Sequence, residues 1–283
     1  MNILVFGANG QLGSSFRKIA KNYIYSWTFV DKDDIDFCDK QALSDYLYKT
    51  NFDIVVNCAA YTAVDAAEND KDICYKINVE APAVIAEVVK SKGKVLFHIS
   101  TDYVFDGETT TPYTETVVPN PINYYGITKL KGEEAIRTCK TSGFIIRVSG
   151  LVSEFGSNFV KNIAEKMLTQ SEISVVNTQI SRFTYAPDLA NLIVRLIGKE
   201  GYEPVVLNFA NKHAMSWAQL AMLVKERLKC SCTIKEVQSY PQEAKRPLYS
   251  VLDTSKVERM YNVGIKPIES RINLCLADIL GED

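Results

Sequence analysis

Several features that would mark other classes of protein are scarce in this chain of 283 residues. The seven cysteines are odd in number and scattered, so they do not form the framework of a disulfide-rich secreted domain. The two histidines, His98 and His213, are far apart and have no ligand spacing. The one close cysteine pair, Cys230 and Cys232, has no second pair or neighbouring histidine, so we expect a helix end entering a strand there. We predict no structural or catalytic metal.

Neither sign of charge dominates. The formal net charge is −2, from 32 Lys+Arg and 34 Asp+Glu, so the chain has no broad basic surface for nucleic acid or an anionic membrane. No apolar stretch approaches the length of a membrane span, and the first residues enter a strand pattern without a signal peptide. We therefore expect a cytoplasmic location. Hydrophobic residues make up 47% of the chain, enough for a globular core.

The first half of the chain alternates apolar strand patterns with amphipathic helical segments such as 81–90. This alternation is typical of βαβ units, and it predicts an α/β fold with a Rossmann-type, doubly wound parallel sheet. The expected strands are 3–5, 28–30, 54–57, 95–99 and 144–148.

Near residue 150 the alternation loosens. We expect residues 1–150 to form the dinucleotide-binding domain and residues 151–283 to form mainly a smaller α/β substrate-binding lobe, with some segments returning to the main sheet. Segment 108–121, rich in threonine and proline, is the best candidate for a mobile loop near the site. The later elements are predicted as helices 159–168, 188–197 and 217–228, and as strands 173–176, 205–208 and 232–236.

A glycine-rich turn follows the first strand, with glycines at positions 7, 10 and 13. Glycines let the backbone turn tightly and approach a pyrophosphate, which the free N–H groups and dipole of the next helix attract. Such a loop is by itself also compatible with an ordinary turn.

Tyr125 and Lys129 are four residues apart, and in a helix this spacing places the phenol and the ammonium on one face. The positive charge would lower the pKa of the phenol and prepare it for proton exchange. Thr101 follows strand 95–99, and ligands of open α/β sheets bind at the carboxyl ends of strands. Taken singly, these residues are also compatible with a chance spacing, a solvated charge and a capping hydroxyl. Their order after the glycine loop favours a nucleotide-dependent redox site, and Tyr124 has no lysine four residues later.

Several stretches of the chain carry a family resemblance. The chain resembles the extended short-chain dehydrogenases/reductases and, among them, the dTDP-4-dehydrorhamnose reductases of dTDP-rhamnose biosynthesis. The similarity spans nearly the whole chain, in stretches 6–13, 56–65, 100–107, 121–130, 158–160, 184–190 and 244–250.

The resemblance implies an NADPH or NADH cofactor and assigns roles to particular residues. Tyr125 would be the proton donor, Lys129 would hold the nicotinamide ribose, and Thr101 would orient the substrate carbonyl. Gly10, Gln11 and Leu12 would lie along the pyrophosphate. The full set expected to bind the cofactor is Gly7, Gly10, Gln11, Leu12, Gly13, Asp31, Asp36, Phe37, Ala60, Tyr61, Thr62, Ile99, Tyr125 and Lys129.

Asp31 bears on the choice between the two cofactors. It follows strand 28–30, where a carboxylate accepts hydrogen bonds from the adenosine ribose and repels a 2′-phosphate, which favours NADH. The adjacent Lys32 acts in the opposite direction, and an acidic turn explains Asp31 equally well.

A nucleotide-diphosphate sugar needs cationic and amide donors and an aromatic surface. The candidates are Thr101, Asp102, Asn158, Arg182 and Arg246, with Phe183 and Lys245 as further surface or core positions.

Three departures from the family pattern affect the expected substrate and assembly. Gly150 stands where the rhamnose-forming enzymes usually carry a tryptophan, and segment 179–184 differs from their Gln-Ile-Gly-Ser-Pro-Thr stretch. We therefore expect the sugar or the nucleotide to differ from the family's standard substrate. Ser14 and Ser15 replace a glutamate that helps some relatives bind magnesium and dimerise, so a metal-bridged dimer is not expected and a homodimer is left open.

The leading hypothesis is NAD(P)H-dependent reduction of the 4-keto group of a nucleotide-activated deoxysugar, dTDP-4-dehydrorhamnose to dTDP-L-rhamnose. One alternative is a nucleotide-sugar epimerase or dehydratase, although residues 101–103 lack the acidic pair common in related dehydratases. The other alternative is a non-catalytic, cofactor-binding regulatory subunit, because the regulatory subunit of methionine adenosyltransferase resembles the same reductases.

Overall fold

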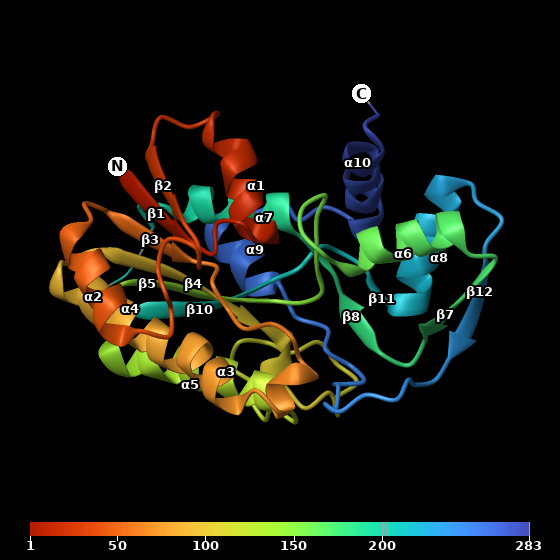
Figure 1. Cartoon of the computed structure of the whole chain (residues 1–283), viewed down its shortest axis with the longest axis horizontal. Coiled ribbons are helices and arrows are strands. Elements are labelled where there is room, and N and C mark those ends of the chain that lie inside the picture. The colour runs from red at the N-terminus through yellow and green to blue at the C-terminus, as the bar shows by residue number, and fades with distance from the viewer. Residues whose placement is uncertain (200, 202, 283) are drawn as a thin grey trace.

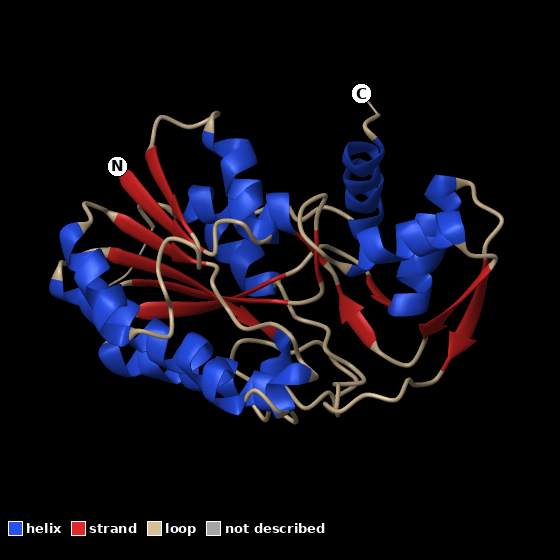
Figure 2. Ribbon diagram, in the orientation of Figure 1, coloured by secondary structure: helices blue, strands red, loops and turns tan. Residues whose placement is uncertain are grey.

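Six strands form the central sheet of the computed structural model, which describes residues 1–199, 201 and 203–282 (Figures 1 and 2). The strand order is β10-β5-β4-β3-β1-β2, and every neighbouring pair is parallel. The predicted doubly wound α/β fold is thereby confirmed. The strands are β1 (Asn2–Phe6), β2 (Ser26–Val30), β3 (Ile54–Asn57), β4 (Val95–Thr101), β5 (Gly143–Val148) and β10 (Pro204–Phe209).

Helices cover both faces of this sheet (Figure 1). On one face, Leu12, Phe16 and Ile19 recur at helical spacing along α1 and pack against Ile3 and Val5 of the sheet. This face carries α1 (Gln11–Ala20), α7 (Ala186–Leu196) and α9 (Ser255–Tyr261).

The opposite face is covered by helices whose apolar residues pack on Leu4, Val55 and Leu96. Strands buried by helices on both faces read as continuous apolar runs, as in β3. The helices here are α2 (Lys40–Lys49), α4 (Ala81–Ser91) and α5 (Tyr124–Cys139), with α3 (Lys71–Tyr75) and short helical segments η1 (Ala66–Glu68), η2 (Lys76–Glu80) and η3 (Asp102–Val104) beside them.

A second group of elements has its own hydrophobic core, which contains Met167, Phe183, Leu220 and Ile272. It lies beyond the carboxyl ends of the main strands (Figure 1). Its helices are α6 (Phe159–Thr169), α8 (Trp217–Leu228) and α10 (Ile268–Leu280), and its strands are β7 (Glu172–Val176) with β12 (Thr233–Val237) and β8 (Ile180–Arg182) with β11 (Ala214–Ser216). Short β6 (Leu151–Val152) and β9 (Thr184–Tyr185) pair where the chain crosses between the two groups.

Every strand and helix predicted from the sequence lies within two residues of an observed one. The predicted strand 205–208 is β10, which adds to the edge of the main sheet beside β5, while α7 returns to pack on α1. Cys230 and Cys232 lie between the end of α8 and the start of β12, as expected.

Segment 108–121 is held at its middle by Tyr113, which is buried, stacks on Phe105 and pairs with Leu252. Its mobility stays a prediction. Across the described ranges, no helix combines the length and the apolar character that crossing a membrane requires.

Candidate active site

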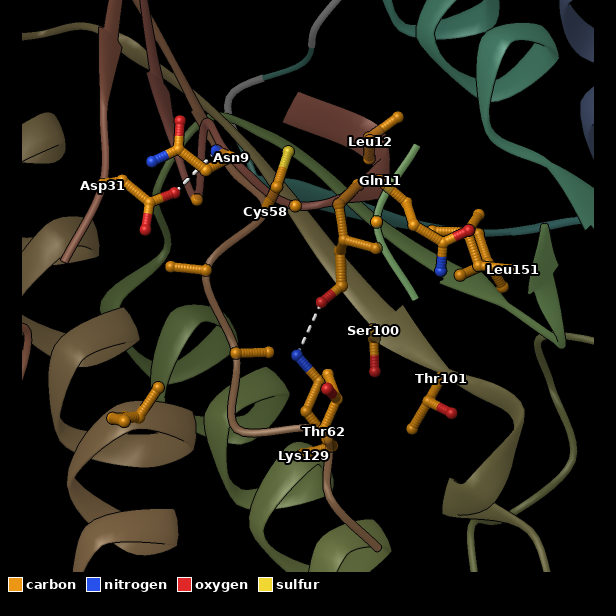
Figure 3. A pocket seen from close by; sticks show the side chains of 18 of the residues that line it. Asn9, Gln11, Leu12, Asp31, Cys58, Thr62, Ser100, Thr101, Lys129 and Leu151 are labelled. Carbon is orange, nitrogen blue, oxygen red and sulfur yellow. Dashed lines mark hydrogen bonds between the residues drawn. The ribbon is translucent and has the colours of Figure 1, made fainter. Parts of the chain in front are cut away.

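Two adjoining cavities lie at the carboxyl ends of β1, β3, β4 and β5. The larger has a volume of about 630 Å³ and the smaller about 170 Å³. Thr62, Thr101, Tyr125 and Gly150 line both cavities, so these residues mark the place where the two meet. Figure 3 shows side chains that line the larger cavity.

The glycine loop forms one end of the larger cavity. Gly7 has a φ of +72°, and a Cβ there would lie 2.7 Å from the backbone nitrogen of Ala59. A Cβ at Gly13 would collide with the carbonyl of Gly7, so glycine lets α1 pack closely against the loop. Gln11 and Leu12, the first residues of α1, line the cavity. The free N–H groups of this first turn and its positive dipole suit a pyrophosphate.

Asp31 and Lys32 lie at the end of β2 and line the same cavity. Asp31 Oδ2 accepts a hydrogen bond from the backbone nitrogen of Asn9 at 2.7 Å (Figure 3), and Oδ1 accepts one from the backbone nitrogen of Lys32 at 2.8 Å. The carboxylate therefore ties the glycine loop to β2, and both a carboxylate and an ammonium face the cavity.

Other predicted cofactor-binding residues divide into those that line the cavity and those that do not. Phe37, Ala60, Thr62 and Ile99 line it. Asp36 does not, and its Oδ1 accepts a hydrogen bond from the backbone nitrogen of Cys38. Tyr61 does not either, because its phenol donates a hydrogen bond to Asp70 Oδ2 at 2.6 Å.

Tyr125 and Lys129 lie in the first turns of α5, which begins after its N-cap Asn123. The Asn123 side chain accepts a hydrogen bond from the backbone nitrogen of Gly126 at 2.8 Å. A Cβ at Gly126 would collide with the carbonyl of Tyr103, so this glycine brings α5 close to the end of β4. Both predicted side chains are buried and line the larger cavity.

The predicted influence of Lys129 on the Tyr125 phenol is wrong for this arrangement. Burial raises the pKa of Tyr125, with the negative charge of Asp102 acting in the same direction and a hydrogen bond with Thr101 opposing it. Lys129 Nζ instead donates a hydrogen bond to the carbonyl of Ile99 at 2.6 Å (Figure 3). Burial lowers the pKa of Lys129 to about 8, against the opposing charge of Glu133.

Asp102 is a buried carboxyl in the wall of the smaller cavity. Its Oδ1 accepts a hydrogen bond from Thr101 Oγ1 at 3.1 Å, and the side chains of Ser250 and Ser181 also hydrogen-bond to it. Burial raises its pKa from 3.8 to about 6, although the three hydroxyls oppose this rise. A chain of hydroxyls and one carboxyl thus continues from Tyr125 and Thr101 into this cavity.

Three of the predicted substrate-binding residues line neither cavity. Asn158 is the N-cap of α6, and its Oδ1 accepts a hydrogen bond from the backbone nitrogen of Lys161. Arg182 Nη1 donates to the carbonyl of Leu252 at 3.1 Å. Arg246 pairs with Asp65, with 2.7 Å between Nη2 and Oδ2, and also hydrogen-bonds to Tyr103 in the cavity wall. Lys245 is exposed and Phe183 is fully buried.

The structure also brings residues to the cavities that the sequence analysis did not single out. In the larger cavity these are Cys58 and the segment around Gly156, and in the smaller one they are Gln179, Ser250 and Trp217. No spacing in the sequence links these positions to the site, because they come from separate loops and from the start of α8. Within the described ranges, no group of three or more His, Cys, Asp or Glu residues is arranged to hold a metal ion.

The chain is similar in sequence and in fold to several known proteins. The family described as the RmlD substrate binding domain matches residues 1–280. The dTDP-4-dehydrorhamnose reductase of Aggregatibacter actinomycetemcomitans is 30% identical over 278 residues, covering 94% of each chain. The crystal structure of a dTDP-4-dehydrorhamnose reductase from Clostridium acetobutylicum has a TM-score of 0.94 at 32% identity and covers 99% of this chain and 100% of its own. That of the Bacillus anthracis reductase in complex with NADP has a TM-score of 0.93 at 29% identity, covering 98% and 99%.

Proposed function

The chain belongs to the RmlD substrate binding domain family, and from this we propose that it is an oxidoreductase that uses NADPH or NADH to reduce the 4-keto group of a nucleotide-activated deoxysugar. The reaction is dTDP-4-dehydrorhamnose to dTDP-L-rhamnose. The observation that carries this proposal is that Thr101 and Tyr125 line both cavities. A carbonyl reduction needs a proton donor at the place where cofactor and sugar meet.

The relatives favour the reductase over both alternatives. Several relatives that match nearly the full length of this chain are named dTDP-4-dehydrorhamnose reductases. One of the similar structures is a complex with NADP. A UDP-glucose 4-epimerase of Thermus thermophilus is also similar in structure, but at 17% identity it shows the shared fold alone.

The larger cavity fits a nicotinamide dinucleotide. Its volume lies in the range of about 300–1,000 Å³ that is usual for ligand sites, and the glycine loop would hold the pyrophosphate on the N-terminus of α1. When bound, the reduced cofactor supplies the hydride that reaches the carbonyl carbon. Phe37, Ala60 and Thr62 would contact the remainder of the dinucleotide from the ends of β2 and β3.

Tyr125 would donate the proton to the carbonyl oxygen. A phenol is protonated near neutral pH at its ordinary pKa of about 10, and burial, which raises the pKa of Tyr125, keeps it in this state, the one a proton donor needs. Thr101, which hydrogen-bonds to the phenol, would orient the carbonyl oxygen and stabilise the charge that develops on it. Lys129, fixed on the Ile99 carbonyl at 2.6 Å, places a positive charge beside the cofactor cavity and would hold the nicotinamide ribose.

The smaller cavity would take the sugar. Its wall carries the hydroxyls of Thr101, Ser181 and Ser250 and the carboxyl of Asp102, groups that hydrogen-bond to sugar hydroxyls. The division into a dinucleotide-binding part, residues 1–150, and a mainly sugar-binding part, residues 151–283, stays a proposal, because seven of the thirteen residues that line the smaller cavity lie within 1–150. A cytoplasmic location and a homodimer remain predictions, to be checked by cell fractionation and by light scattering.

The proposal is tested by following the oxidation of NADPH and NADH by absorbance. The substrates are dTDP-4-dehydro-6-deoxy-L-mannose and a panel of other nucleotide-linked 4-keto sugars. Tyr125→Phe should lower kcat by about 10²–10⁴-fold, the usual contribution of a positioned acid, while cofactor binding persists. Tyr124→Phe is the matched control, because that phenol bonds to the carbonyl of Lys71 and lines neither cavity. Equal activity in both variants, or turnover with no sugar of the panel, would contradict the proposal.

A further inference from the structure

Trp217 forms part of the wall of the smaller cavity, together with the phenols of Tyr103 and Tyr125. Trp217 is the first residue of α8 and is half-buried. It lines the same cavity as Thr101 and as Tyr125, the proposed proton donor. Most of the other lining groups are hydroxyls, amides and carboxyls.

The position of this indole is closely fixed by its neighbours. The ring of Phe183 lies 4.7 Å from it at 70°, and the ring of Phe159 lies 4.7 Å from it at 59°. The Phe183 pair is edge-to-face, an arrangement that is favourable beyond the area it buries. The backbone is also fixed, because Ser216 and Gln219 form a capping box at the start of α8. The indole is therefore held in place without a ligand.

Gly150 lies where the two cavities meet and packs against Phe183. This glycine lines both cavities at a φ of +45°, and a Cβ there would lie 2.9 Å from Phe183 Cε1 and closer still to Cδ1. Position 150 therefore admits no side chain while Phe183 fills the space beside it. Phe183 in turn supports Trp217, which lines the smaller cavity.

We propose that the indole face of Trp217 is the surface on which the sugar ring of the nucleotide sugar packs, which makes Trp217 a specificity-determining residue. This inference rests on the proposed function. A deoxyhexose has an apolar C–H face and a methyl group, which pack on an aromatic ring while its hydroxyls bond to polar groups. Trp217 contributes this apolar surface, and Thr101, Ser181 and Ser250 contribute hydrogen bonds.

Tryptophan fluorescence tests this contact without any turnover. The chain has two tryptophans, and Trp27 lies on β2 against Phe16 and Phe29 and lines neither cavity. The variant Trp27→Phe therefore leaves Trp217 as the sole reporter. Titration with dTDP-L-rhamnose should change its emission saturably, and dTDP alone should change it less. Unchanged emission, with binding of the nucleotide sugar demonstrated by calorimetry, would overturn the proposal.

Steady-state kinetics provide the second measurement. Trp217→Leu should raise KM for the nucleotide sugar by about tenfold or more and leave KM for NADPH unchanged, because a packing surface acts equally in the ground and transition states. Trp217→Phe keeps an aromatic ring, so its KM for the nucleotide sugar should rise less than that of Trp217→Leu. Phe159→Leu is the matched control, since it disturbs the same cluster from outside the cavity.

A purely structural role for Trp217 would show in different quantities. It would lower the thermal midpoints of Trp217→Leu and Phe159→Leu alike. The ratio of KM for the nucleotide sugar to KM for NADPH would then stay at its wild-type value in both variants, and that result would refute the inference. If the wild-type protein oxidised neither NADPH nor NADH with any of the sugars, the proposed reduction would be refuted. The Trp217 proposal would still be tested separately, because the fluorescence titration measures contact between a nucleotide sugar and Trp217 without turnover.

Discussion

Replacing Asp102 by asparagine is expected to stabilise the folded chain, and more strongly as the pH rises. The Asp102 carboxyl is 3% exposed and surrounded by the hydroxyls of Thr101, Ser181 and Ser250. An amide keeps the acceptor that Thr101 uses, and its N–H groups can donate to the serine hydroxyls. The substitution therefore removes a buried charge and preserves the hydrogen bonds.

The magnitude follows from the pKa. The rise from 3.8 to about 6 is roughly 2 pH units, which corresponds to about 3 kcal/mol of destabilisation when the carboxyl is ionised. Because the raised pKa means that the folded state holds the proton more tightly, this destabilisation is complete above about pH 6 and disappears as the pH falls towards 3.8. We expect Asp102→Asn to add about 3 kcal/mol at pH 8 and roughly half of that at pH 5.

Urea unfolding at the two pH values, followed by far-ultraviolet circular dichroism, measures this difference. Asp106→Asn is the control with the opposite sign, because hydrogen bonds from Tyr113 and Asn120 lower the pKa of Asp106. That variant should be less stable than the parent at pH 8, and its deficit should shrink at lower pH. If Asp102→Asn gives the same change in unfolding free energy at pH 5 and pH 8, or is destabilising at pH 8, the electrostatic reasoning fails.

Three further changes have expected outcomes. Arg147→Met should lower the free energy of unfolding in urea by about 3–5 kcal/mol, because the buried Glu133 loses the ion-pair partner that it contacts at 2.6 Å. Adding Glu133→Leu should restore most of this loss. Lys32→Ala should raise KM for NADPH several-fold and leave KM for NADH unchanged, since an ammonium in the cavity wall favours a 2′-phosphate. Gly150→Ala combined with Phe183→Ala should destabilise by less than the two single changes together, as thermal unfolding would show, because removing the ring removes the collision.

The fold was predictable because its signals are local. A strand covered on both faces, such as 54–57, is an unbroken apolar run, and a helix such as 159–168 repeats its apolar residues at helical spacing. The position of β10 at the edge of the sheet could not be predicted from such local patterns. Its pairing with β5 depends on a chain return over some sixty residues, and strand periodicity does not name a partner.

The predicted site residues also divide into those that local sequence patterns identify and those whose positions depend on tertiary contacts. Tyr125, Lys129 and the glycine loop depend on short spacings, and the structure brings them to one cavity. Asn158 and Arg182 are predicted from their residue type and from segments compared with the family, not from a spacing that links them to the site. Arg182 instead bonds to the carbonyl of Leu252, and Asn158 caps its own helix. A cationic or amide side chain meets its partners through tertiary contacts, which the sequence around it does not specify.

The pKa of Tyr125 shows why correct residues do not guarantee a correct electrostatic prediction. Helical spacing places Lys129 on the same face as the phenol, but it does not reveal that the carbonyl of Ile99 holds the ammonium, nor that both side chains are buried. Burial opposes charge on each group, so it raises the pKa of the phenol and lowers that of the lysine to about 8. A phenol with the ordinary pKa of about 10 is already protonated near neutral pH, so the rise keeps Tyr125 in the state that a proton donor needs without itself setting the direction of the reaction.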